Sequence, residues 1–137
     1  MLKRYGSILE RIEDRYGVPG GVLVAIWGLE SDYGVNQGKY STIRSLATLA
    51  YDGCRSEKFR AELLDALRII ERGDLTSGEM IGAWAGEIGQ TQFLPSAYLR
   101  FAVDFEGYGH RGLIHSGLNA LASTANYGRQ AMDRRQP

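Results

Sequence analysis

Apolar residues recur along most of the chain at the three- and four-residue spacing of an α-helix. The first segment shows this pattern clearly, with apolar residues on one helical face: Tyr5, Ile8, Leu9, Ile12 and Tyr16. Valine, isoleucine and threonine never alternate with polar residues over the length of a strand. The sequence therefore predicts an all-α fold with at most one short irregular hairpin.

Glycine, proline and serine mark the ends of the predicted helices. Gly17 ends the first helix, and Pro19 suits the first turn of a second helix over residues 20–30. Ser41 and Ser56 can cap the next two helices. The remaining predicted segments are helices over 42–53 and 57–74, a glycine-interrupted stretch over 77–89, a helix opened by Pro95 over 96–105, and a last helix over 117–132.

The composition fits one domain without a strongly charged partner. A chain of 137 residues suits a single domain over 1–137. Its 16 basic and 16 acidic residues are scattered, which disfavours nucleic acid and anionic membranes as partners. No apolar run reaches the roughly 20 residues of a membrane helix, so we expect any export signal to lie outside this sequence. Nothing suggests an extended apolar interface, and we expect a monomer.

One carboxylate lies at the end of the most apolar predicted helix. In the stretch VLVAIWGLESDYG, residues 22–34, apolar residues surround Glu30. The helix is apolar nearly all round and is predicted to be buried at the centre of the fold. A helix C-terminus and an apolar environment both favour the protonated carboxyl group, the form that a general acid needs. The alternative is that Glu30 points to solvent from the last helical turn.

A polar loop offers side chains suited to a saccharide. In AGEIGQTQFLPSAY, residues 85–98, glycines and Pro95 shape a loop that displays Gln90, Thr91 and Gln92. Amide side chains both donate and accept hydrogen bonds, as recognition of hydroxyl and acetamido groups requires. Aromatic side chains are available to pack on the apolar faces of sugar rings: Trp27, Tyr33, Trp84, Phe93 and Tyr98. An ordinary polar turn with core aromatics is the alternative.

The segment DFEGYGH, residues 104–110, matches a calcium loop only in part. Oxygen-bearing residues stand at alternate positions, but Tyr108 occupies a place where an aspartate would be expected. His110 and His115 lack the matched partners of a zinc site, and Cys54, the single cysteine, has neither a disulfide partner nor an activating base nearby in sequence. A glycine-rich turn is the simpler interpretation, and we expect neither a metal ion nor a cofactor.

Five motifs occur in an order and at a spacing that resemble the lytic murein transglycosylases of the membrane-bound B type and their soluble relatives. They are VPGGVLVAIWGLESDYG, SLATLAYD, AGEIGQTQFLPSAY, AVDF and ALASTANY, and they cover roughly residues 18–127. The resemblance implies a lysozyme-like α-helical fold in which Glu30 is the catalytic residue at the C-terminal end of the central helix. It also implies cleavage of the β-1,4 bond between N-acetylmuramic acid and N-acetylglucosamine in peptidoglycan, in the periplasm or cell envelope, with a 1,6-anhydromuramoyl product.

The resemblance also implies substrate-binding residues. Gln92 matches the loop glutamine beside the catalytic acid, and Tyr127 matches the cleft tyrosine of the ANY motif. Arg55 falls near an arginine pair in which Cys54 replaces one member. The full predicted substrate-binding set is Gln92, Tyr127, Tyr33, Gln90, Arg55 and Tyr98.

The sequence departs from the family's pattern in several places. Ala83 stands where a serine able to hydrogen-bond the glutamate is common, and Glu87 replaces a small loop residue. Tyr108 and Asn119 replace acids of the family's calcium loop. The sequence ends at residue 137, where relatives continue into further cleft-forming segments, so we expect a domain that is truncated relative to full-length relatives.

A single carboxylate suffices for the chemistry that the resemblance implies. Protonated Glu30 would give its proton to the glycosidic oxygen, and the resulting carboxylate would take a proton from the muramoyl C6 hydroxyl as that hydroxyl attacks the anomeric carbon. Because the attack is intramolecular, neither water nor a second acid is needed. Two alternatives stay open: a muramidase that uses water, with Glu87 or Asp104 as second acid, and a non-catalytic peptidoglycan-binding module.

Overall fold

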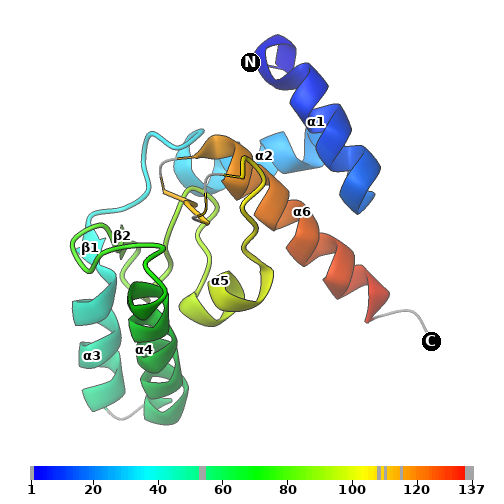
Figure 1. Ribbon diagram of the computed structural model, residues 1–137. Helices are drawn as coiled ribbons and strands as arrows, with labels where there is room; N and C mark the ends of the chain where they lie inside the picture. The colour runs from blue at the N-terminus through cyan, green and yellow to red at the C-terminus, as the bar shows by residue number, and fades with distance from the viewer. Residues whose placement is uncertain (1, 53–54, 108, 110, 115, 135–137) are drawn as a thin grey trace.

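The computed structural model describes residues 2–52, 55–107, 109, 111–114 and 116–134. Within them the elements run α1 (Leu2–Tyr16), α2 (Gly20–Ser31), β1 (Tyr40–Ser41), α3 (Thr42–Tyr51), α4 (Ser56–Glu71), β2 (Ile81–Gly82), α5 (Pro95–Phe101) and α6 (Gly117–Asp133). Figure 1 shows α1 and α2 at one end of the molecule, α3 and α4 at the other, and α5 and α6 between them. The predicted all-α class is confirmed. None of the described helices is both long enough and apolar enough to cross a membrane.

The small sheet joins two segments that are distant in the chain, so it is not the hairpin that the sequence allowed. β1 and β2 pair antiparallel, with Tyr40 opposite Gly82 and Ser41 opposite Ile81. The close approach requires glycine, because a Cβ atom on Gly38 would lie 2.2 Å from the carbonyl oxygen of Gly82. The sheet thereby holds the segment after α2 against the loop that precedes α5.

Helix boundaries follow the predicted caps in part. Ser41 caps α3 as predicted, its hydroxyl oxygen accepting a hydrogen bond from the Arg44 N–H at 3.3 Å. Ser56 is instead the first residue of α4, with Arg55 at the N-cap position. The helix opened by Pro95 ends earlier than predicted because α6 side chains accept the next backbone donors. These bonds run from Val103 N–H to Ser123 Oγ at 2.9 Å and from Phe105 N–H to Asn119 Oδ1 at 2.8 Å.

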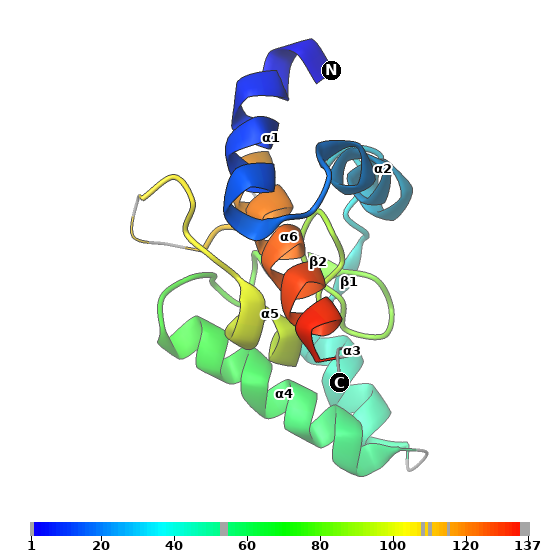
Figure 2. The ribbon, with the colours of Figure 1, turned by 90° about the vertical axis from the view of Figure 1, so that its right-hand side faces the viewer.

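The first half of α6 is the most deeply buried helical segment. Every residue from 119 to 125 is buried, and most of them are small. Ala120 belongs to a core formed with α3, α4 and α5, whereas Leu121 belongs to a second core formed with α1 and α2. Figures 1 and 2 show α6 running between these two groups of helices. Small side chains let elements on several sides pack closely against one helix.

α2 is buried on one face only, which corrects the prediction that it is the central buried helix. Leu23 and Trp27 pack in the core with α1 and α6. On the other side of the helix, Leu29 is 87 % exposed and Val22 is 49 % exposed. An apolar sequence favours burial, but burial also needs a neighbouring element, and no element within the described residues covers this outer face.

Candidate active site

A groove lies where α2, α5, α6 and the loop before α5 meet. Its first part is a pocket of about 300 Å³ lined by Ile26, Thr91, Gln92, Phe93, Leu94, Ala97, Thr124 and Tyr127. A second pocket of about 480 Å³ adjoins the first, because both are lined by Leu94, Ala97 and Tyr127. We call the first pocket the glutamine half of the groove, after Gln92, and the second the arginine half, after Arg100 and Arg134.

Glu30 lies in the last turn of α2, beside the glutamine half. It follows Ile26 by four residues, so both side chains lie on the same face of the helix, and Ile26 lines the groove. The backbone turns directly afterwards, with positive φ angles of 49° at Asp32 and 60° at Tyr33. The N–H of Gly34 donates to Ser31 Oγ at 2.9 Å and stabilises this turn. The main chain of Glu30 is therefore fixed one helical turn beyond Ile26, the α2 residue that lines the groove.

The side chain of Glu30 is exposed to solvent. It forms no hydrogen bond or ion pair with any residue that the structure describes. The prediction of a buried acid in an apolar pocket is therefore wrong, and the alternative of a carboxylate pointing to solvent from the last helical turn is observed. Glu30 is the last residue but one of α2, and the chain turns away directly after it, so no following turn of the helix covers its side chain.

Gln92 is held so that one of its polar atoms remains available in the groove. Its backbone has a positive φ of 55°, which places the residue on a tight turn. Its Nε2 donates to the carbonyl oxygens of Gln37 at 3.0 Å and Gly89 at 2.8 Å, so both amide hydrogens are used. The Oε1 atom has no hydrogen-bond donor among the described residues and can accept one from a ligand hydroxyl or amide.

Two of the predicted tyrosines are partly exposed, and of these Tyr127 lines the groove whereas Tyr33 lines neither half. Tyr127 is 45 % exposed, lines both halves of the groove, and packs against Phe93 and Phe101 with ring centroids 5.9 and 4.9 Å apart. Tyr33 is 41 % exposed and packs edge-on against Trp27 at 5.6 Å. Both rings are thus fixed by aromatic neighbours while keeping an open face, an arrangement suited to contact with a sugar ring.

Comparison with known families supplies the decisive observation. Residues 1–134 match the family described as Transglycosylase SLT domain. The chain belongs to this family. The match spans Glu30, Gln92 and Tyr127, so the residues gathered at the groove all lie within the SLT domain.

Individual relatives agree with this assignment. The membrane-bound lytic murein transglycosylase B of Escherichia coli is 34 % identical over 125 residues, which cover 90 % of this chain and 34 % of that protein. A crystal structure of SltB3 from Pseudomonas aeruginosa in complex with NAG-NAM-pentapeptide is 49 % identical, with a TM-score of 0.92, and covers 95 % of this chain and 35 % of that one. SltB3 in complex with NAG-anhNAM-pentapeptide matches at 49 % identity over the same shares, with a TM-score of 0.91. The chain thus spans about a third of the length of these relatives.

Gln90 was predicted to bind substrate, but in this SLT domain its side chain is occupied by the fold. Its Oε1 accepts a hydrogen bond from the Trp27 indole N–H at 2.8 Å, and its Nε2 donates to the carbonyl oxygen of Ile114 at 3.0 Å. The residue is buried. Gln90 therefore ties the loop to α2 and to the segment before α6, and we do not count it among the groove residues.

Tyr98 and Arg55 also lie away from the groove. Tyr98 is fully buried, and its hydroxyl donates to the carbonyl oxygen of Arg111. Burial raises the pKa of the Tyr98 hydroxyl, and the Asp74 carboxylate raises it further. Arg55 precedes α4, at the end of the α3–α4 pair that is farthest from α2 in Figures 1 and 2. Neither side chain reaches Glu30 in this structure.

The degenerate calcium segment forms a self-contained turn. The carboxylate of Asp104 accepts hydrogen bonds from the N–H groups of Gly107 at 2.9 Å and Gly109 at 2.6 Å. Asn119 Oδ1 accepts from Phe105 N–H. The described residues contain no group of three or more His, Cys, Asp or Glu suited to a metal ion. Four residues that were considered for a metal site or a disulfide lie outside the described residues: Cys54, Tyr108, His110 and His115.

Sequence reasoning missed several residues that line the groove. Ile26 and Thr124 line the groove but were not predicted as site residues. Each shares a helical face with a predicted site residue. Ile26 precedes Glu30 by four positions, and Thr124 precedes Tyr127 by three. Extending each candidate along its own helical face would have found them. The same extension from Tyr127 through Ala131 reaches Arg134, seven positions on, whereas Arg100 has no such relation to a predicted site residue.

Proposed function

We propose that this SLT domain is a lytic transglycosylase that cleaves the β-1,4 bond between N-acetylmuramic acid and N-acetylglucosamine in peptidoglycan. The proposal includes action in the periplasm or cell envelope, where peptidoglycan lies, and a monomeric enzyme. Its product is a 1,6-anhydromuramoyl end. Support comes from the family, and from the complexes of SltB3 with NAG-NAM-pentapeptide and NAG-anhNAM-pentapeptide.

The observation that carries the proposal is one carboxylate, Glu30, on the helical face of the groove residue Ile26, and a groove lined by no carboxyl group among the described residues. Glu30 shares a helical face with Ile26, and the groove continues over Gln92 and Tyr127. No residue among those that line its two halves carries a carboxyl group. A muramidase needs a second acid or another means to position water, and neither Glu87 nor Asp104 lines the groove. This favours chemistry that uses one carboxylate.

The reaction balances with Glu30 acting twice. The Glu30 carboxylic acid donates its proton to the glycosidic oxygen as the bond to the muramoyl anomeric carbon breaks, and N-acetylglucosamine leaves as an alcohol. The Glu30 carboxylate then takes the proton of the muramoyl C6 hydroxyl, whose oxygen bonds to the same anomeric carbon. Glu30 is again protonated and no water is consumed. The C6 hydroxyl belongs to the sugar under attack, so its effective concentration is high.

Solvent exposure of Glu30 in the free domain is compatible with this role. A saccharide bound over Gln92 and Tyr127 would lie beside the last turn of α2 and exclude water from the carboxyl group. Excluding water strengthens the interactions of the acid with the departing oxygen. The environment that favours proton donation is then completed by the bound saccharide and not by the fold of the free domain.

Digestion of purified peptidoglycan tests the proposal. Muropeptides released by the wild-type domain should be one water lighter than hydrolytic products when measured by mass spectrometry. Glu30→Gln should abolish their release without unfolding the domain, because the side chain is exposed and makes no described polar contact. Glu10→Gln, which alters an exposed residue on α1, is the matched control and should cleave like wild type.

Each other outcome has a defined meaning. Products with reducing ends would show that the domain is a muramidase and not a transglycosylase. Binding to peptidoglycan without products would support the non-catalytic module. Substantial cleavage by the Glu30→Gln variant would remove Glu30 from the proposed role.

A further inference from the structure

The arginine half extends the groove beyond the saccharide contacts proposed above. It is lined by Leu94, Ser96, Ala97, Arg100, Phe101, Tyr127, Ala131 and Arg134. Tyr127 stands at the boundary between the two halves. A ligand in the glutamine half can therefore continue past Tyr127 into a pocket of about 480 Å³.

The charge of this pocket is positive and not neutralised within it. Arg100 lies in the last turn of α5 and Arg134 follows α6, and neither forms an ion pair with a described residue. The Arg100 guanidinium lies 5.4 Å from the centroid of the Phe101 ring, which leaves its N–H groups available for hydrogen bonds. No acidic residue lines the pocket.

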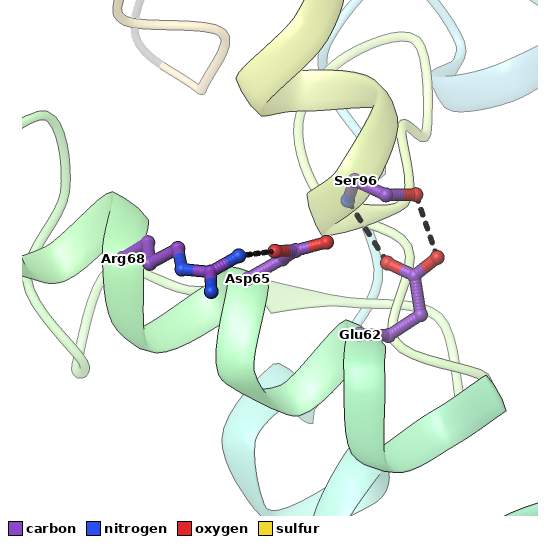
Figure 3. A network of polar contacts seen from close by, with 4 residues as sticks. All are labelled: Glu62, Asp65, Arg68 and Ser96. Carbon is purple, nitrogen blue, oxygen red and sulfur yellow. Dashed lines mark hydrogen bonds and ion pairs between the residues drawn. The ribbon is translucent and has the colours of Figure 1, made fainter. Parts of the chain in front are cut away.

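Ser96, which also lines the pocket, is already paired. Figure 3 shows Glu62 of α4 reaching Ser96 at the start of α5. The Ser96 hydroxyl donates to Glu62 Oε1 at 2.6 Å, and the Ser96 N–H donates to Oε2 at 2.9 Å. The buried Glu62 carboxylate is thereby satisfied by Ser96. The charged donors left to a ligand in this pocket are the two guanidinium groups.

We propose that the arginine half binds carboxylate groups of the peptide stem carried by the muramoyl residues of peptidoglycan, an inference that rests on the proposed function. Guanidinium groups bind carboxylates through paired, charge-assisted hydrogen bonds. A pentapeptide spans about 17 Å when extended. The two halves share Leu94, Ala97 and Tyr127, so a stem carried by a sugar beside Gln92 can continue past Tyr127 into the pocket. The SltB3 relative was solved with a saccharide bearing such a pentapeptide.

A second group in peptidoglycan also carries a carboxylate. A muramoyl residue without its stem carries a free lactyl carboxylate, so the test must separate the two groups. The disaccharide GlcNAc–MurNAc serves this purpose because it lacks a MurNAc–GlcNAc bond and cannot be cleaved by the proposed reaction. With the pentapeptide it presents stem carboxylates, and without the peptide it presents only the lactyl carboxylate.

Isothermal titration of both disaccharides tests the inference without relying on catalysis. The wild-type domain should bind the pentapeptide form more tightly than the bare form, and salt raised from about 0.05 to about 0.5 M should narrow the difference. In the double variant Arg100→Gln/Arg134→Gln, the ratio of the two affinities should fall about tenfold. Arg60→Gln, at an exposed site on α4 outside both halves, should keep the wild-type ratio.

The outcomes separate this inference from the proposed function. An unchanged ratio in the double variant, an equal loss for both disaccharides, a preference for the bare form, or no binding of either would each overturn stem recognition by the arginines. Formation of anhydro products is measured only in the digestion experiment. If no anhydro products form, the proposed cleavage fails. The ratio of the two disaccharide affinities still tests whether the arginine half binds the stem.

Discussion

Replacing Gln90 by methionine should destabilise the whole domain, with little effect on saccharide binding by the molecules that stay folded. Gln90 is buried between α2 and the segment before α6. Its amide accepts from the Trp27 indole at 2.8 Å and donates to the Ile114 carbonyl at 3.0 Å. Methionine has a similar length and flexibility but offers neither a strong acceptor nor a donor. The substitution therefore tests hydrogen bonding more than volume.

The magnitude follows from the two groups that Gln90 contacts. The buried Trp27 N–H would lose its acceptor, at about 1–3 kcal/mol, whereas the Ile114 carbonyl oxygen would keep the hydrogen bond from Gln37 Nε2 at 2.9 Å. The packing is close, since a Cβ atom on Gly34 would lie 2.4 Å from Gln90 Oε1, so relaxation has little room. We expect a loss of about 1–3 kcal/mol in the free energy of unfolding, or roughly 3–10 °C in Tm for a domain of this size.

A double-mutant cycle isolates the Trp27–Gln90 bond. Trp27→Phe removes the indole donor and also leaves space in the second core, where Trp27 contacts Tyr5 and Tyr33. In the Gln90→Met background the indole N–H has already lost its acceptor. The double variant should therefore be more stable than the sum of the two single losses predicts, by about 1–2 kcal/mol.

Guanidinium denaturation followed by circular dichroism gives the stabilities, and titration with the bare disaccharide gives the affinities. If Gln90→Met keeps wild-type stability within about 0.5 kcal/mol and yet loses saccharide affinity, the structural role of Gln90 is refuted. The substrate-binding role predicted from the sequence would then be restored. If the losses of the two single variants add up to the loss of the double variant, the Trp27–Gln90 hydrogen bond itself is refuted.

Two further predictions concern groups outside the groove. Because the pKa of Tyr98 is raised in the fold, the unfolded chain loses this proton first. The free energy of unfolding should fall as the pH rises above about 10, and Tyr98→Phe should flatten that fall; identical slopes would contradict it. Glu87 Oε2 is buried without a hydrogen-bond partner in the described structure, so Glu87→Ala should raise the unfolding free energy by about 1 kcal/mol in urea titrations. Glu57→Ala, at an exposed site on α4, is its control, and a loss of stability in Glu87→Ala would argue for a hidden partner.

Helix positions could be predicted from the sequence because they depend on local pattern. The periodic apolar residues of α1 and the Ser41 cap of α3 each act within a few residues of the chain. The end of α5 could not be predicted in this way. It is set by Ser123 and Asn119, which lie on α6 and accept the backbone donors that follow α5.

Burial could not be predicted from local pattern because it depends on which elements meet. α2 is the most apolar segment, yet Leu29 is 87 % exposed. The first half of α6 mixes alanine with serine, threonine and asparagine and carries little sign of a core helix, yet it is buried on all sides. Small size decides this case, because short side chains allow packing on several faces at once.

The same reasoning explains why Gln90 and Gln92 differ although they are two residues apart. The turn at Gly89 and the positive φ of Gln92 direct the two amides to different surroundings. Gln90 hydrogen-bonds Trp27, one turn before Glu30 on α2, whereas Gln92 lines the groove. The buried amide thereby fixes the distance between the loop and the helix that carries the acid. Under the proposed function, a loop that holds Gln92 through a neighbour bonded to α2 would keep Gln92 and Glu30 in register while the acid itself stays exposed until a saccharide covers it.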